Sequence, residues 1–260
     1  MTTRIEINDV LWRREQKIIL KDINWTVRKG EHWAILGLNG SGKTTLLNMI
    51  TGYLWPTQGE ISVLGHRYGT VDLRELRKRI GWVSSSFQER IHPGEKAQYL
   101  VISGLHASIG LFDKPAEEHI QKAVHLMETL GCGHLVNRGY QTCSQGEKQK
   151  LLIARALMAS PELLILDEAC NGLDILSRES LLQAIAKLAN QEDAPTLLYV
   201  THHVEEILPE FTHTLLLRKG SVFAAGRTPE VINGERLSAL FETHVQVDWR
   251  NQRAWLSLVQ

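Results

Sequence analysis

Two patterns of apolar residues alternate along the chain, and together they predict an α/β fold. Short runs rich in Ile, Val, Leu and Trp predict β-strands in the first 36 residues and again after residue 162. Between about residues 88 and 160 the apolar residues recur at helical spacing instead, as in Ile120, Val124 and Met127. The pattern therefore predicts a β-rich core that is interrupted by a mainly helical insertion.

Strands are expected where a short apolar run is bounded by residues typical of turns. In chain order these runs are 4–10, 18–27, 33–36, 59–64, 80–84, 163–166, 196–200, 215–217, 221–225, 245–249 and 254–259. The runs at 163–166 and 196–200 are apolar throughout, as strands buried on both faces require, and a helix is expected between them at 177–189. Turns are expected at Asn8–Asp9 and Lys29–Gly30, and the last four runs predict two hairpins.

Residues 37–45 read Gly-Leu-Asn-Gly-Ser-Gly-Lys-Thr-Thr and match a phosphate-binding loop between a buried strand and a helix. Glycines let successive backbone N–H groups surround a polyphosphate, and the helix start adds its positive dipole end. Lys43 is expected to reach the β- and γ-phosphates, and the Thr44 hydroxyl to ligate Mg²⁺. The predicted contacts of a nucleoside triphosphate are Asn39, Gly40, Ser41, Gly42, Lys43, Thr44 and Thr45.

Two further segments supply groups suited to hydrolysis. Asp167 and Glu168 follow the apolar run 163–166, and a buried strand delivers its last residues to the sheet edge where nucleotides bind. Asp167 is expected to hold Mg²⁺, and Glu168 to polarise the water that attacks the γ-phosphate. His202 follows the run 196–200 and is expected to contact the same phosphate. Each feature also has a simpler interpretation when it is taken alone. Residues 37–45 could be a glycine-rich turn, Asp167 and Glu168 a solvated strand end, and His202 a structural histidine.

Composition narrows the class of protein. The chain has 260 residues, 43% of them apolar, and a formal net charge of zero, so nothing in its overall charge favours a nucleic-acid partner. Its three cysteines are an odd number without CxxC spacing, which disfavours a disulfide framework or a structural zinc site and fits a reduced, cytoplasmic compartment. The most membrane-like stretch, 99–112, is too short and too polar to span a bilayer.

The segment 143–150, Cys-Ser-Gln-Gly-Glu-Lys-Gln-Lys, resembles the signature of ATP-binding cassette (ABC) ATPases, usually Leu-Ser-Gly-Gly-Gln. The phosphate loop, helical insertion, signature, carboxylate strand and histidine also occur in that family's order. The resemblance implies a P-loop α/β core with an N-terminal antiparallel β subdomain and a helical insertion. The whole chain, 1–260, is then one cassette, with the core and β subdomain in about 1–87 and 161–260 and the helical subdomain in about 88–160.

The resemblance also implies site residues and partners. Trp12 matches the aromatic residue that stacks on adenine, and Asp174 matches the residue that links the two sites of a dimer. Cassettes of this family form head-to-tail homodimers, so Ser144, Gln145, Gly146 and Asp174 would contact the ATP held by a second copy. Mg²⁺ would accompany the ATP. A separate integral-membrane permease is the implied partner, and no nucleic acid is expected.

Several residues depart from the family's pattern. Cys143, Gln145 and Glu147 replace Leu, Gly and Gln in the signature. In Ile-Gly-Trp-Val-Ser-Ser-Ser-Phe-Gln, Ser85 stands where the family's Mg²⁺-binding glutamine is usual, and Gln88 comes three residues later. Either Ser85 supplies a hydroxyl ligand to the metal, or the loop uses Gln88. The triple serine and the altered signature are similar to a branch of molybdate-transport-associated ATPases.

Two functions follow as hypotheses. The first is the ATPase subunit of a bacterial ABC transporter, a cytoplasmic protein bound to the inner face of the cell membrane through its permease. The alternative is a soluble ABC ATPase with a regulatory or repair role, which the altered glutamine loop favours. In the first case the permease would choose the substrate, so the sequence does not reveal what is transported or in which direction.

Overall fold

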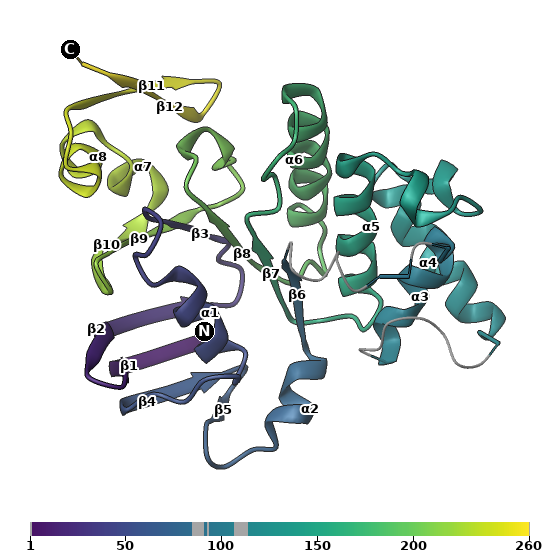
Figure 1. Ribbon diagram of the computed structural model, residues 1–260, viewed down its shortest axis with the longest axis horizontal. Helices are drawn as coiled ribbons and strands as arrows, with labels where there is room; N and C mark the ends of the chain where they lie inside the picture. Colours follow the sequence, from purple (N-terminus) through teal and green to yellow (C-terminus); the bar gives the residue numbers. More distant parts are fainter. Residues whose placement is uncertain (1, 85–90, 93, 107–113, 260) are drawn as a thin grey trace. The chain divides into compact units, whose positions relative to one another are not determined.

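The computed structural model describes residues 2–84, 91–92, 94–106 and 114–259 and divides the chain into two compact units (Figure 1). The first unit comprises Met1–Arg77 and Thr196–Gln260, and the second comprises Lys78–Pro195. Each unit is built around strands that the apolar pattern predicts. The first unit contains the phosphate loop and His202, and the second contains Asp167, Glu168 and the segment 143–150.

The first unit contains an antiparallel sheet in the order β2-β1-β4-β5. Its strands are β1 (Thr3–Arg14), β2 (Lys17–Arg28), β4 (Gln58–Val63) and β5 (His66–Arg67). Alternate side chains along β1 and β2 are buried, because successive residues of a strand face opposite sides of a sheet. The core of this sheet includes Ile5, Ile7, Val10, Ile23, Trp25 and Val27.

The predicted turn at Asn8–Asp9 is wrong, because β1 continues through it to Arg14. The register between β1 and β2 shifts between Ile7 and Val10, and Asp9 has a positive φ of 50°, so the residues form a β-bulge. Asn24 on β2 holds the bulge: its side-chain oxygen accepts from the Asp9 amide at 2.9 Å, and its amide nitrogen donates to the Asp9 carboxylate at 3.0 Å. A bulge and a turn share the same polar residues, so the local sequence did not distinguish them.

A second set of strands in the first unit lies in the order β10-β9-β3-β8. The strand β3 (Trp33–Leu36) is parallel to β8 (Thr196–Thr201) and to β9 (His213–Arg218), and β10 (Ser221–Arg227) is antiparallel to β9. Every residue of β3 and β8 is buried, as their apolar runs predict. Helix α1 (Lys43–Ile50) follows β3.

The C-terminal part of the first unit adds two helices and a hairpin. Helices α7 (Thr228–Val231) and α8 (Gly234–Phe241) follow β10, and the predicted hairpin is present as β11 (Val245–Arg250) and β12 (Arg253–Leu258). The apolar pattern did not predict the two helices, which are only four and eight residues long. The start of α8 is capped by the side chain of Asn233, which accepts from the Arg236 amide at 2.9 Å.

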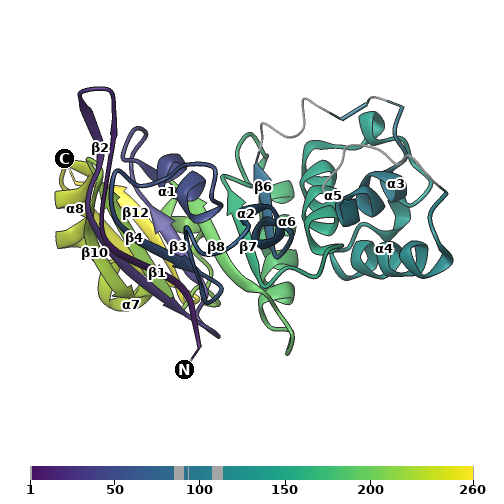
Figure 2. The ribbon, with the colours of Figure 1, turned by 90° about the horizontal axis from the view of Figure 1, so that it is seen from below.

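The second unit combines a parallel strand pair with helices. The strands are β6 (Ile80–Ser84) and β7 (Leu163–Asp167), and the helices are α3 (Ala97–Ile102), α4 (Glu117–Thr129), α5 (Gln145–Leu157) and α6 (Ile175–Ala189). Figure 2 shows α3, α4 and α5 gathered together, and α2 (Leu73–Lys78) leads into β6. The predicted helical spacing lies on α4, where Ala123 and Met127 are buried. Within the described residues, no helix combines the length and the hydropathy needed to cross a membrane.

Candidate functional site

The phosphate loop joins β3 to α1 in the first unit. Gly42 precedes the helix with a φ of 106°, and the Leu46 amide donates to the Gly42 carbonyl at 2.9 Å. No side chain among the described residues caps the start of α1. The first N–H groups of the helix therefore point towards a site that an anion can fill.

Glycine is required at two positions of this loop. A Cβ atom on Gly37 would lie 2.4 Å from the Leu217 carbonyl oxygen, and one on Gly42 would lie 2.6 Å from Leu20 Cδ2. Gly42 also has the left-handed backbone that side chains rarely adopt. The loop thus packs closely against neighbouring strands, which fixes the path of its backbone.

The polar atoms of the Lys43 and Ser41 side chains are buried within the loop. Lys43 is only 6% exposed, and its Nζ donates to the carbonyls of Gly37 at 2.8 Å and Leu38 at 3.2 Å. The Ser41 Oγ is buried and has no hydrogen-bond partner in the described part of the chain. A buried hydroxyl without a partner is unfavourable, so a phosphate oxygen that accepted from it would remove this cost.

The turn between β9 and β10 supports the loop, a role that no local pattern of residues indicates. The Gly220 amide donates to the Ser41 carbonyl at 2.9 Å, and the Gly220 carbonyl accepts from Lys21 at 2.8 Å. A cavity of about 160 Å³ lies beside the loop, lined by Leu38, Asn39, Gly40, Ser41, Leu217, Arg218, Lys219, Leu240 and Glu242. Hydrogen bonds from Lys219 and Arg218 lower the pKa of the Glu242 carboxyl to about 2, so the carboxylate stays charged and offsets part of the positive charge of these two residues.

Two other predicted residues lie in the same unit as the loop. Trp12 is half-buried on β1 and pairs with Leu20, the residue whose side chain packs against Gly42. His202 directly follows Thr201, which pairs with Leu36 in the parallel sheet. Because parallel strands end at a common edge, His202 and the phosphate loop leave the sheet on the same side.

The two predicted acids lie at the end of β7 in the second unit: Asp167 is its last residue, and Glu168 follows it. Asp167 pairs with Ser84 at the ends of β7 and β6, and both Asp167 and Glu168 are half-buried. Glu168 has a φ of 51°, a left-handed conformation that is uncommon for a residue other than glycine and that concentrates at functional sites. The next residue after Ser84 is the predicted ligand Ser85, which lies outside the described residues, as does Gln88.

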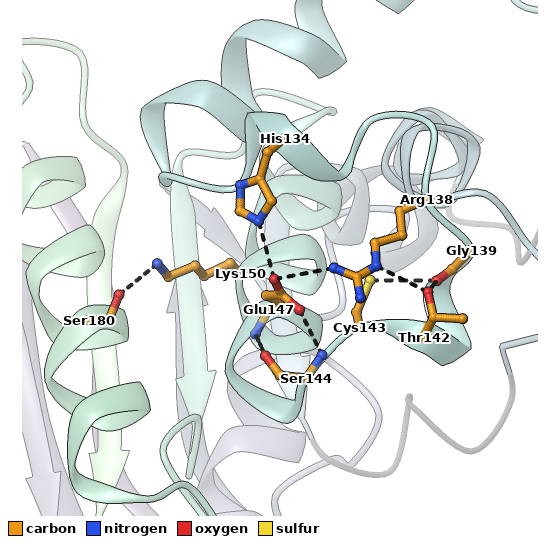
Figure 3. A network of polar contacts seen from close by, with 9 residues as sticks. All are labelled: His134, Arg138, Gly139, Thr142, Cys143, Ser144, Glu147, Lys150 and Ser180. Carbon is orange, nitrogen blue, oxygen red and sulfur yellow. Dashed lines mark hydrogen bonds and ion pairs between the residues drawn. The ribbon is translucent and has the colours of Figure 1, made fainter.

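Glu147, which stands in place of the usual glutamine, takes part in capping the start of α5 (Figure 3). Ser144 and Glu147 form a capping box: the Glu147 amide donates to Ser144 Oγ at 3.3 Å, and the Ser144 amide donates to Glu147 Oε2 at 2.7 Å. The other carboxylate oxygen lies 3.2 Å from His134 Nε2 and 4.0 Å from Arg138 Nη1. Burial raises the pKa of Glu147, but hydrogen bonds from Ser144 and His134 and the charge of Arg138 outweigh it, so that the pKa is lowered.

The remaining predicted contacts lie beside this capping box. A Cβ on Gly146 would lie 3.1 Å from Ser177 Cβ, so glycine lets α5 approach the first turn of α6. Asp174 caps α6: it accepts from the amides of Leu176 and Ser177, and Ser177 Oγ donates to it at 2.7 Å. The predicted residues thus form two groups, one in each unit, with Ser144, Gln145 and Asp174 exposed in the second.

The capping box gives a prediction for stability. Replacing Ser144 by alanine is expected to lower the free energy of unfolding by about 1 kcal/mol, because the Glu147 amide loses its acceptor. Chemical denaturation measures this change. The matched control is Gln145→Ala, at the exposed first residue of the same helix, which should leave stability within about 0.5 kcal/mol of the starting value. Equal losses in both variants would contradict the cap.

Comparison with known proteins identifies the family. The ABC transporter family model matches residues 20–171, more than half of the chain. The chain belongs to the ABC transporter family of ATP-binding proteins. It is 50% identical over 254 residues to YlmA of Bacillus subtilis (strain 168), an uncharacterized ABC transporter ATP-binding protein, with 97% of this chain and 96% of YlmA covered.

Two further relatives extend this result. The molybdate import ATP-binding protein MolC of Haemophilus influenzae is 30% identical, with 87% of this chain and 83% of MolC covered. A dimeric ATP-binding cassette solved with ADP and Pi in a post-hydrolysis state is 27% identical, with a TM-score of 0.71 and coverage of 86% of this chain and 98% of that one.

The comparisons confirm four predictions from the sequence: the family, the P-loop α/β cassette fold with its antiparallel β subdomain, the ATPase activity, and the role as a transporter's ATP-binding subunit. The similarity to molybdate-transport ATPases is confirmed as well. The assignment of individual site residues stays a prediction.

Proposed function

We propose that this ABC ATPase works as a homodimer that powers transport through a separate integral-membrane permease. The phosphate loop supports the ATP-binding part of this proposal, because it combines an uncapped helix start, a buried lysine and a buried serine hydroxyl with no partner in the described residues. Each of these groups can offer a hydrogen bond or positive charge to the oxygens of a polyphosphate. Residues 39–45 then hold the ATP phosphates, and Trp12 stacks on the adenine.

Mg²⁺ is the proposed companion of ATP. The Thr44 hydroxyl and the Asp167 carboxylate are oxygen donors of the kind that Mg²⁺ prefers, and both are at least partly exposed, so these residues fit the ion. Ser85 is a further proposed ligand. When bound, Mg²⁺ neutralises charge on the phosphate oxygens.

Glu168 is the proposed general base. Its carboxylate would orient the attacking water and accept its proton, while His202 donates a hydrogen bond to the γ-phosphate. Lys43 binds the same phosphate chain as a buried cation. The position of Glu168 directly after β7 supports this role, because the end of a buried strand lies at the sheet edge where nucleotides bind in this architecture.

The second copy of the chain would complete the site. Ser144, Gln145 and Asp174 are exposed, and the neighbouring side chains of Ile175 and Leu176 are 69% and 82% exposed. Adjacent apolar residues with this exposure are typical of a surface that a partner covers. The cassette solved with ADP and Pi is itself dimeric, which supports a dimer here. In a head-to-tail dimer, Ser144 and Gly146 of one copy contact the γ-phosphate bound by the other.

The permease is proposed from the names of the relatives, which are transporter subunits. Attachment to it would place this chain on the cytoplasmic face of the membrane. Co-expression with the permease encoded nearest to its gene is expected to move the protein from the supernatant to the membrane pellet after centrifugation. The permease-free strain is the control. A protein that stays in the supernatant with every neighbouring permease would favour the alternative, a soluble regulatory or repair ATPase.

A further inference from the structure

The segment after β8 that carries His202 is held from inside by a buried carboxylate. Glu206 belongs to the short 3-10 helix η5 (Val204–Glu206) and is only 3% exposed. Its Oε2 accepts hydrogen bonds from Tyr199 Oη at 2.9 Å and from Thr201 Oγ1 at 2.6 Å. Thr201 Oγ1 also accepts from the His203 amide at 3.0 Å. These bonds fix both residues that flank His202.

The same segment is held from outside by the C-terminal hairpin β11–β12. Arg253, the first residue of β12, directs its guanidinium at the carbonyl of Glu205 within η5, and its Nε donates to that oxygen at 3.0 Å. A second donor, Arg253 Nη2, bonds the same oxygen. The guanidinium centre lies 5.6 Å from the Trp255 ring centroid, a cation–π contact that restrains the arginine.

The two anchors act on neighbouring residues of one short loop, Glu206 and Glu205. The inner anchor is built from residues within seven positions of each other, whereas the outer anchor comes from a residue 48 positions later. The Glu205 side chain adds a contact, because its Oε1 lies 3.4 Å from His203 Nδ1. A charged donor that binds a backbone carbonyl twice fixes direction as well as distance. Loss of the outer anchor would therefore loosen η5 at Glu205, while the inner hydrogen bonds of Thr201 and Glu206 remain.

We propose that the hairpin β11–β12 acts as a latch on the loop that carries His202, with Arg253 as a positioning residue that holds His202 in place for hydrolysis. This inference rests on the role proposed above for His202. Arg253 bonds the loop backbone and is not among the residues proposed to bind ATP, so its expected contribution concerns turnover and not ATP binding. A displaced hydrogen-bond donor loses much of its effect on a transition state, because such interactions depend on fixed geometry.

Steady-state kinetics of the full-length chain tests the latch. Arg253→Ala is expected to lower kcat for ATP by roughly three- to tenfold with KM nearly unchanged, because positioning but not binding is lost. Arg253→Lys, which keeps one charged donor, should recover part of kcat. The matched control is Arg250→Ala, which removes an exposed arginine from the other strand of the same hairpin, at the position paired with Arg253. This control should keep the original kcat.

A double variant separates this inference from the role of His202. If Arg253 acts through His202, adding Arg253→Ala to His202→Ala causes no further loss of kcat. A full additional loss in the double variant, a rise in KM, or an unchanged kcat in Arg253→Ala overturns the latch and leaves the role of His202 intact. An unchanged kcat in His202→Ala instead overturns the role of His202, and the latch with it.

Discussion

Glu168→Gln is expected to reduce steady-state ATP hydrolysis at least about 100-fold while ATP binding is retained, because a positioned general base contributes about 10²- to 10⁴-fold to a rate. Glutamine has nearly the same shape as glutamate, so the turn that begins at residue 168 can keep its hydrogen bond from the Asn171 amide to the Glu168 carbonyl. The side chain loses its negative charge and, with it, the ability to accept a proton. Phosphate release measures the first effect, and titration with ATP measures the second.

The matched control for this variant is Glu162→Gln. Glu162 lies just before β7, at the opposite end from Glu168, and its Oε1 accepts a hydrogen bond from Arg79 Nε at 2.6 Å. Like Glu168→Gln, this substitution removes one carboxylate charge beside β7, but at the other end of the strand. Hydrolysis should be unchanged. Normal turnover in Glu168→Gln would show that another group accepts the proton. Lost ATP binding would show that Glu168 holds the nucleotide or the fold instead.

The segments that carry the candidate catalytic and binding residues could be predicted, because the residues of each segment are adjacent in the sequence. The run 163–166 is apolar on both faces, so it had to be a buried strand, and the acids after it had to lie at a strand end. Residues 37–45 were recognisable for the same reason, since the glycines and the lysine are adjacent in sequence. The left-handed backbone at Glu168 adds information that the residue type does not carry.

Contacts between distant residues could not be predicted in the same way. The bulge at Asp9 depends on Asn24, and the support of the phosphate loop depends on Gly220. The bond between Arg253 and Glu205 likewise requires a hairpin that follows the strand β8 by more than 40 residues. None of these pairs has a sequence spacing that marks it, because the fold alone brings its members together.

The signature shows an intermediate case. Ser144 and Glu147 have the three-residue spacing of a capping box, so the reciprocal hydrogen bonds were predictable from local sequence. The structure shows that Glu147 turns back to the start of its own helix, near His134 and Arg138. Its negative charge is therefore balanced within the second unit.

Replacement of Lys43 is expected to weaken ATP binding itself, in contrast to Glu168→Gln. Hydrogen bonds to charged groups contribute about 1.5–3 kcal/mol. Loss of the ammonium should therefore raise the Kd for ATP by about 10- to 150-fold. Because Lys43 is buried, Lys43→Ala also leaves a cavity and removes the donor to the Gly37 carbonyl, which would lower stability.

A second variant separates the loss of charge from the loss of packing. Lys43→Met keeps an unbranched side chain of similar length within the loop, so its stability should exceed that of Lys43→Ala while its affinity for ATP stays low. The control is Lys29→Ala, which removes an exposed lysine from the turn before β3 and should leave Kd unchanged. Calorimetric titration with ATP, alongside thermal unfolding without nucleotide, distinguishes the two effects. If Lys43→Met bound ATP as tightly as the unmodified chain, the ammonium would have no part in holding the phosphates, and the observed bonds to Gly37 and Leu38 would be its whole role.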